Sequence, residues 1–85
     1  MNKKITVKND RGRILYCILP GEGELQSHIR KFLFGKEVPD GGYSALLYED
    51  RIDIIDCIAY DRVTSFDILS IEDTDSDLCS EWVEV

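Results

Sequence analysis

The stretch KKITVKNDRGRILYCIL, residues 3–19, decides the fold. Its first part alternates polar and apolar residues, with Ile5 and Val7 on one side, which predicts a strand with one buried face. The letters NDRG that follow are typical of a tight turn, because Asn and Asp favour turns and Gly accepts a left-handed backbone. Residues 13–19 are then almost continuously apolar, as expected of a strand that is central in its sheet or covered on both faces. The stretch therefore predicts an antiparallel hairpin.

One helix is predicted directly after this hairpin, in ELQSHIRKFLFG, residues 24–35. Glutamates at its start, basic residues in its last turns and Gly35 at its end agree with the helix dipole and with capping preferences. A helix of about three turns is not stable alone, so its apolar side must pack against a sheet. That side is a single stripe at helical spacing, made of Leu25, Ile29, Phe32 and Leu33.

The rest of the chain predicts three or four further strands joined by short turns. The strand-like segments are residues 43–49, 52–60, 63–71 and 78–85. By periodicity 52–60 fits a helix about as well, but its three isoleucines favour a strand. Short consecutive connections favour antiparallel pairing. We therefore expect a single α+β domain over residues 1–85: ββα followed by three or four strands, forming a curved antiparallel sheet with one helix packed on one face.

Charge is distributed very unevenly along the 85 residues, whose formal net charge is −7. Residues 1–48 hold eight Lys and Arg against five acids, a net charge of +3. Residues 49–85 hold two Arg against twelve acids, a net charge of −10. With 44% hydrophobic residues the chain is too apolar for a disordered acidic protein. We therefore expect the acids to lie on the surface of a folded domain.

The acids of the C-terminal part predict a negative surface. If the strands that carry them are neighbours in the sheet, their carboxylates would share one broad face. Such a face would attract a basic protein partner, or compete for a groove that normally holds nucleic acid. The simpler interpretation is that the charge only keeps a small domain soluble. The candidate partner-binding residues are Asp53, Asp56, Asp67, Asp73, Asp75, Asp77, Glu81 and Glu84.

Trp82 lies in the last predicted strand, together with Val83 and Val85. We expect this strand to lie at an edge of the sheet, and edges pair with other chains unless they are blocked. Trp82 is therefore a candidate contact for a partner or for a second copy of the chain. Equally, its ring would complete a small core.

The segment EDTDSDLCSEWVEV, residues 72–85, places carboxylates at the spacing of a calcium loop. Counted from Asp73, the residues Asp75, Asp77 and Glu84 fall at positions 3, 5 and 12. However, Leu78 stands where the sharp turn of such a loop needs Gly, and both flanks read as strands rather than helices. A solvated acidic turn is the preferred interpretation, and no metal or other cofactor is expected.

The sequence offers little for catalysis. His28 is the only histidine, and no spacing ties it to a serine or cysteine. The three cysteines are an odd number, which argues against a disulfide scaffold. We expect Cys17 and Cys57 to be buried thiols. Cys79 follows an acidic run, and nearby negative charge disfavours a thiolate.

These observations favour a cytoplasmic, non-enzymatic interaction protein that binds a basic site on a partner protein. A pI of about 4.5 opposes direct contact with nucleic acid phosphates, and no apolar run approaches the roughly 18 residues of a membrane helix. Small bacterial or phage-encoded inhibitors, immunity proteins and nucleic-acid mimics are comparable in size and charge alone. The alternative is a homo-oligomeric small-ligand-binding or structural module that assembles through an edge strand.

Overall fold

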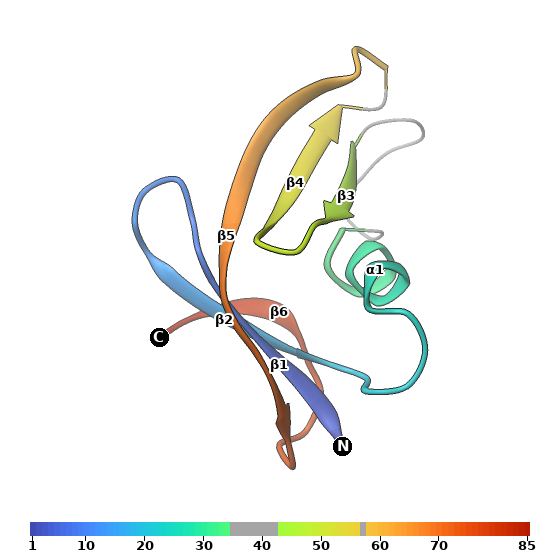
Figure 1. Ribbon diagram of the computed structural model, residues 1–85, viewed down its shortest axis with the longest axis vertical. Helices are drawn as coiled ribbons and strands as arrows, with labels where there is room; N and C mark the ends of the chain where they lie inside the picture. The colour runs from blue at the N-terminus through green and yellow to red at the C-terminus, as the bar shows by residue number, and fades with distance from the viewer. Residues whose placement is uncertain (35–42, 57) are drawn as a thin grey trace.

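Six strands form one antiparallel sheet in the order β3-β4-β5-β1-β2-β6, with one short helix beside it (Figure 1). The structure is a computed structural model that describes residues 1–34, 43–56 and 58–85. Within them it confirms a small compact domain that combines one short helix with an antiparallel sheet. The strands are β1 Asn2–Lys8, β2 Ile14–Leu19, β3 Tyr43–Leu47, β4 Arg51–Asp56, β5 Asp61–Thr74 and β6 Cys79–Glu84.

The predicted first hairpin is confirmed, since β1 and β2 pair antiparallel from Lys3 opposite Leu19 onward. Its turn is organised by Asn9, whose side-chain oxygen accepts hydrogen bonds from the backbone N–H of Arg11 at 3.0 Å and of Arg13 at 2.8 Å. Gly12 has a φ of +77°, the left-handed conformation that glycine accepts without a steric penalty. The turn residues thus act locally, as the sequence predicts.

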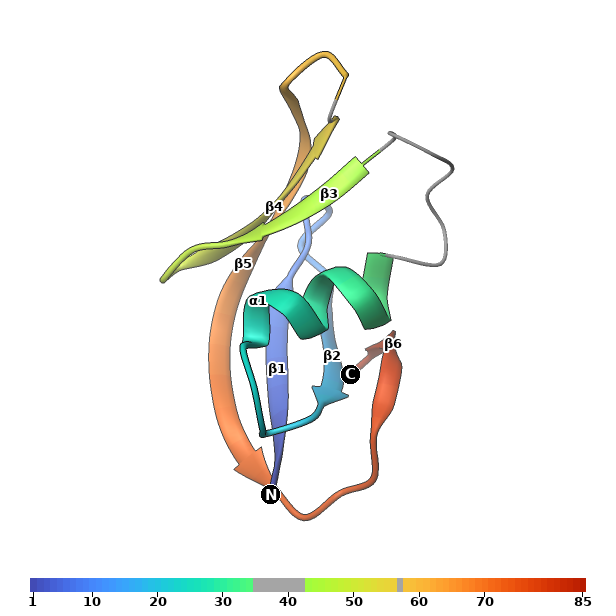
Figure 2. The ribbon, with the colours of Figure 1, turned by 90° about the vertical axis from the view of Figure 1, so that its right-hand side faces the viewer.

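β5 is the longest strand, with 14 residues, and it joins the two parts of the sheet. Its first half pairs with β4 and its second half with β1. The register shifts between Ile54 and Ile55 on β4 and between Thr6 and Val7 on β1. Bulges of this kind bend a strand and increase its twist. The sheet is accordingly curved, with β3 and β4 turned across the top of β1 and β2 (Figure 2).

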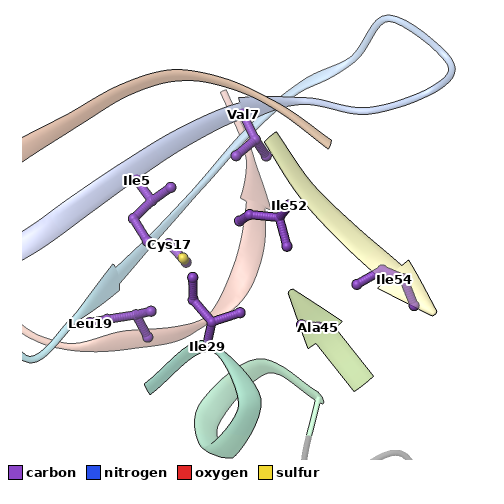
Figure 3. Packing of buried hydrophobic residues seen from close by; sticks show 8 residues of the cluster. All are labelled: Ile5, Val7, Cys17, Leu19, Ile29, Ala45, Ile52 and Ile54. Carbon is purple, nitrogen blue, oxygen red and sulfur yellow. The ribbon is translucent and has the colours of Figure 1, made fainter. Parts of the chain in front are cut away.

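The core lies on the side of the sheet that faces the helix (Figure 3). Side chains from both parts of the sheet meet there, and each fully buried aliphatic side chain stabilises the fold by about 1.5–3 kcal/mol. This convergence explains how so short a chain forms one core. The residues of the cluster are Ile5, Val7, Cys17, Leu19, Ile29, Ala45, Ile52 and Ile54.

The helix begins as α1, Leu25–His28, and continues as the wider π-helical turns of η1, Ile29–Phe34. Of the predicted apolar stripe, Ile29 is fully buried in the core and Leu25 packs against it. The side chains of Phe32 and Leu33, and Gly35 as a whole, lie outside the described part of the chain. The helix contacts both β3 and β6, the two outermost strands of the curved sheet.

The prediction of one strand over residues 52–60 is wrong in its second half. β4 ends at Asp56, because the side-chain oxygen of Asp56 accepts hydrogen bonds from the N–H of Ile58 at 2.8 Å and of Ala59 at 3.2 Å. Tyr60 completes the turn with a φ of +59°. β5 spans Asp61–Thr74, so it begins two residues before the predicted segment 63–71 and ends three residues after it.

Candidate functional site

The eight candidate acids do not share one face. β4 and β5 are neighbours, as the prediction of a common negative face requires, but β1 and β2 separate β5 from β6. The set is therefore divided between two parts of the sheet and the connection that joins them. Asp53 and Asp56 lie on β4, Asp67 and Asp73 on β5, Asp75 and Asp77 in the β5–β6 connection, and Glu81 and Glu84 on β6.

Lysines of β1 lie directly beside acids of β5. The antiparallel register places Lys3 opposite Asp73, Lys4 opposite Glu72, and Lys8 opposite Asp67. Opposite charges in directly facing positions of a sheet attract each other. The basic first half of the chain thus offsets part of the charge of the acidic second half.

Two of the candidate acids serve the fold of β4. Asp53 is only 7% exposed, and its Oδ1 atom lies 3.2 Å from Nε of Arg51. The guanidinium of Arg51 also lies over the ring of Tyr48, 4.3 Å from its centroid. Asp56 holds the turn after β4, as described above. We therefore assign Asp53 and Asp56 structural roles.

Two further candidates form ion pairs at opposite ends of the β1–β2 hairpin. Asp73 accepts a hydrogen bond from Nζ of Lys3, and this bond together with the lysine charge lowers the pKa of Asp73. Glu84 lies 3.7 Å from the guanidinium of Arg13. Since these two acids lie so far apart in the fold, they cannot share the calcium loop considered above. The described residues contain no group of three or more His, Cys, Asp or Glu arranged to hold a metal.

A further group of acids follows the chain from the last part of β5 through the connection into the first part of β6. This connection lies at the end of the molecule where the N-terminus also lies (Figure 1). A hydrogen bond of 2.9 Å from Nδ2 of Asn2 to the carbonyl of Ser76 holds the connection beside β1. All these acids are exposed, and none has an ion pair or side-chain hydrogen bond within the described ranges. We call this group the acidic end, and its residues are Glu72, Asp75, Asp77 and Glu81.

Trp82 points into the protein rather than away from it. Its ring stacks on Phe66 with a centroid distance of 5.4 Å, and it packs against the core cluster. Its indole N–H is buried and has no acceptor among the residues described. The placement agrees with the second sequence-based interpretation, in which Trp82 completes the core.

The edge of β3 is covered by a side chain of the helix. Nε2 of Gln26 donates to the carbonyl of Ala45 at 2.6 Å, and the N–H of Leu47 donates to Oε1 of Gln26 at 2.5 Å. Nε of Arg30 also donates to the carbonyl of Ala45, at 3.4 Å. The carboxamide of Gln26 thus occupies two of the hydrogen-bonding positions that an added strand would need.

The edge of β6 is interrupted by a bulge. Its pairing with β2 runs from Val83 opposite Tyr16 to Cys79 opposite Ile18, so β6 has two more residues than β2 between these pairs. Bulged and charged edges pair poorly with another chain, and Glu81 lies within this bulge.

The candidate catalytic groups lie apart. The ring of His28 contacts the carbonyl of Glu22, with Nε2 as the hydrogen-bonding atom. Cys17 is buried as predicted, and burial, together with the nearby Cys79, raises its pKa to about 12. Such a thiol is protonated at neutral pH and is a poor nucleophile. Cys57 lies outside the described residues.

The sequence-based interpretation missed one surface, a groove beside the first half of β5. Two adjoining hollows, of about 460 and 350 Å³, lie between β5 and the β1–β2 turn. Arg11, Arg13 and Arg62 line the groove together with Val63 and Phe66. The groove exists because β5 is longer than its neighbour β1, so that part of β5 extends past the end of β1. The predicted strand 63–71 is shorter than β5, so the sequence did not indicate this difference in length.

Comparison with known proteins found no matching family model, no similar curated protein and no similar solved structure. Within the described ranges, no helix is long and apolar enough to cross a membrane. The function must therefore be inferred from the surfaces of the molecule.

Proposed function

We propose that the protein is a cytoplasmic, non-enzymatic interaction protein that binds a basic site on a partner protein through the acidic end. The observation that supports this proposal is the exposure of these four carboxylates around one connection, three of which, Asp75, Asp77 and Glu81, neither form an ion pair with a described residue nor lie opposite a basic one. The other candidate acids either have a partner, as Asp53, Asp56, Asp73 and Glu84 do, or lie opposite a basic residue, as Asp67 does.

Electrostatic attraction would be the main contribution of this surface to binding. Like charges held close together repel each other and destabilise the folded state, and an oppositely charged partner relieves that repulsion. Complementary charge also raises the rate of association, by an amount that falls steeply with ionic strength. We therefore expect the acidic end to act mainly by raising the association rate constant for a basic partner.

The finer arrangement expected from the sequence forms part of this proposal. In it, ββα precedes the remaining strands, and the helix packs on one face of the curved sheet. Coverage of that face by the helix leaves the connections and strand ends as the surfaces for a partner, and the acidic end is one of them.

The alternative function, a homo-oligomeric module assembled through an edge strand, is less well supported. Two outward hydrogen-bonding groups of β3, the carbonyl of Ala45 and the N–H of Leu47, bind Gln26, and β6 is bulged and carries exposed acids. Trp82, the proposed contact between copies, packs against the core.

The test begins with capture of proteins from an extract of the host cells on the immobilised protein, followed by identification by mass spectrometry. The purified partner is then titrated at low and at high salt. We expect a basic partner whose affinity falls by about tenfold or more between about 50 and 500 mM salt, because salt screens exposed charges. An affinity that is unchanged by salt would show that charge does not drive binding.

A matched pair of variants locates the surface. The triple variant D75N/D77N/E81Q neutralises three carboxylates of the acidic end, and the control D10N/E49Q/D61N neutralises three exposed carboxylates elsewhere. Both change the net charge equally. We expect the first variant to bind the partner at least about tenfold more weakly than the control. Equal affinities of the two variants would place the binding surface away from the acidic end.

A further inference from the structure

The first half of β5 has a partner strand on one side only. β4 pairs with β5 from Asp61 to Asp67, whereas β1 begins to pair only where Lys8 stands opposite Asp67. Among the residues that the structure describes, residues 61–66 therefore have no strand on the side of β1. Beyond Lys8 the chain turns into β2, and this turn lies across the groove from β5.

The open side of β5 carries backbone groups that can bind an added strand. Ile68 directs its N–H toward the β4 side, to the carbonyl of Asp50 at 2.9 Å. Hydrogen-bonding direction alternates along a strand, so Ser65 and Asp67 direct their N–H and C=O groups to the other side. Asp67 meets β1 there, whereas Ser65 faces the groove. An extended segment placed in the groove would bind β5 at Ser65.

The two hollows of the groove share Val63 and Thr64 of β5, so they adjoin along its open edge. Alternate side chains of a strand point to opposite faces of a sheet, so those of an inserted strand would enter the two hollows in turn. The larger hollow offers apolar surface from Phe66 and from Val63, which is 56% exposed. An apolar side chain of the inserted strand would be buried there.

Arginines provide most of the charge around the groove. Three of the five arginines of the chain line it, in a molecule whose net charge is −7. Arg13 forms an ion pair with Glu84, whereas Arg11 and Arg62 form no ion pair with any described residue. Asp10 and Asp67 also line the groove. Asp67 lies opposite Lys8, which leaves two arginines, Arg11 and Arg62, against Asp10. The groove is therefore suited to carboxylates.

We propose that this groove binds an extended segment of a partner protein, in which acidic and apolar residues alternate, as an added strand on residues 61–66 of β5. Main-chain hydrogen bonds to Ser65 hold the segment, and the hollows select its side chains. A second copy of the chain does not have this chemistry at the same edge, because a two-fold contact would bring the arginines of both copies together. The surface is separate from the acidic end and has the opposite charge preference.

The test uses two fluorescently labelled heptapeptides, TEVEVET and TKVKVKT, at about 150 mM salt. We expect TEVEVET to bind at least about tenfold more tightly. The comparison is stringent, because the net charge of the whole molecule would by itself favour the basic peptide. Backbone amide shifts measured by NMR should concentrate at residues 9–13 and 61–67.

Three variants test the geometry. S65P removes the N–H that faces the groove and leaves the hydrogen bonds between β4 and β5 in place, and R11E reverses one charge in an exposed turn. Each should weaken binding of TEVEVET by at least about tenfold, whereas the control K4E, outside the groove, should change it by less than about twofold. Thermal unfolding verifies that each variant folds, and R11E decides the question if S65P does not fold.

Three results would overturn the proposal. The first is absence of TEVEVET binding, or equal binding of TKVKVKT. The second is unchanged affinity of R11E. The third is a dimer of the unliganded protein, seen by sedimentation, that S65P dissociates, because a second copy would then occupy the edge.

Discussion

At the scale of single residues, the side chain of Gln26 covers part of the edge of β3, where a neighbouring strand would otherwise pair. The carboxamide of Gln26 satisfies two outward-facing backbone groups of β3, the carbonyl of Ala45 and the N–H of Leu47. A backbone group buried without a partner destabilises a protein. Gln26 therefore fixes β3 against the helix and protects an edge at the same time.

Removing this carboxamide is expected to weaken the fold. Q26L leaves the N–H of Leu47 without its partner and the carbonyl of Ala45 with only the longer bond from Arg30, so the free energy of unfolding should fall by about 1–3 kcal/mol. Urea denaturation measures the change. The control is S27A, which alters an exposed neighbour on the same helix and should change stability by less than about 0.5 kcal/mol. If Q26L unfolds at the urea concentration of the unsubstituted protein, Gln26 does not hold β3.

The ion pair of Lys3 and Asp73 predicts a pH dependence. Because the pKa of Asp73 is lowered in the folded state, the pair stabilises the protein above the ordinary pKa of Asp. This contribution is lost as the pH falls through the lowered pKa. K3M should return the pKa of Asp73 toward its ordinary value, as measured by NMR titration of the carboxyl carbon. K8M is the control and should leave Asp73 unchanged; an identical titration in K3M would exclude Lys3 as the cause.

At the scale of elements, features that depend on neighbouring residues in the sequence could be predicted, whereas features that depend on side-chain bonding or distant strand pairing could not. The β1–β2 hairpin follows from Asn9, Gly12 and the alternation around them, all within a few residues of each other. The end of β4 depends on how one side chain, that of Asp56, bonds to the backbone after it, and this is not visible in periodicity. The place of β6 beside β2 depends on distant pairing, so the expectation that acids of successive strands lie together failed for β6.

The role of Trp82 within β6 can be measured. W82A removes the ring that stacks on Phe66 and should lower the free energy of unfolding by about 2–4 kcal/mol, while W82F should cost less because an aromatic ring remains. Urea denaturation and sedimentation are measured together. The control L78A shortens a side chain that is 54% exposed and should have a small effect. Dissociation of an oligomer by W82A at unchanged stability would instead make Trp82 a contact between copies.

At the scale of the whole molecule, the sheet order redistributes charge that the sequence separates. The halves of the chain carry +3 and −10, yet β1 lies between β5 and β2, so lysines face acids along one strand pair. The composition predicted a negative net charge, but it did not predict which carboxylates lack a basic partner in the folded protein. Of the predicted acids, Asp75, Asp77 and Glu81 remain candidates, and they share the acidic end with Glu72.

The central place of β1 also has a consequence for synthesis and folding. Lys3 and its partner Asp73 are 70 residues apart, and pairing over such separations slows folding because a long loop must close first. The β1–β2 hairpin can form as soon as it leaves the ribosome, but the other edge of β1 stays open until β5 has been made. During that interval the positive charges of Lys3, Lys4 and Lys8 disfavour pairing of this exposed edge with another nascent chain. Once β5 has been made, the same lysines lie opposite its acids.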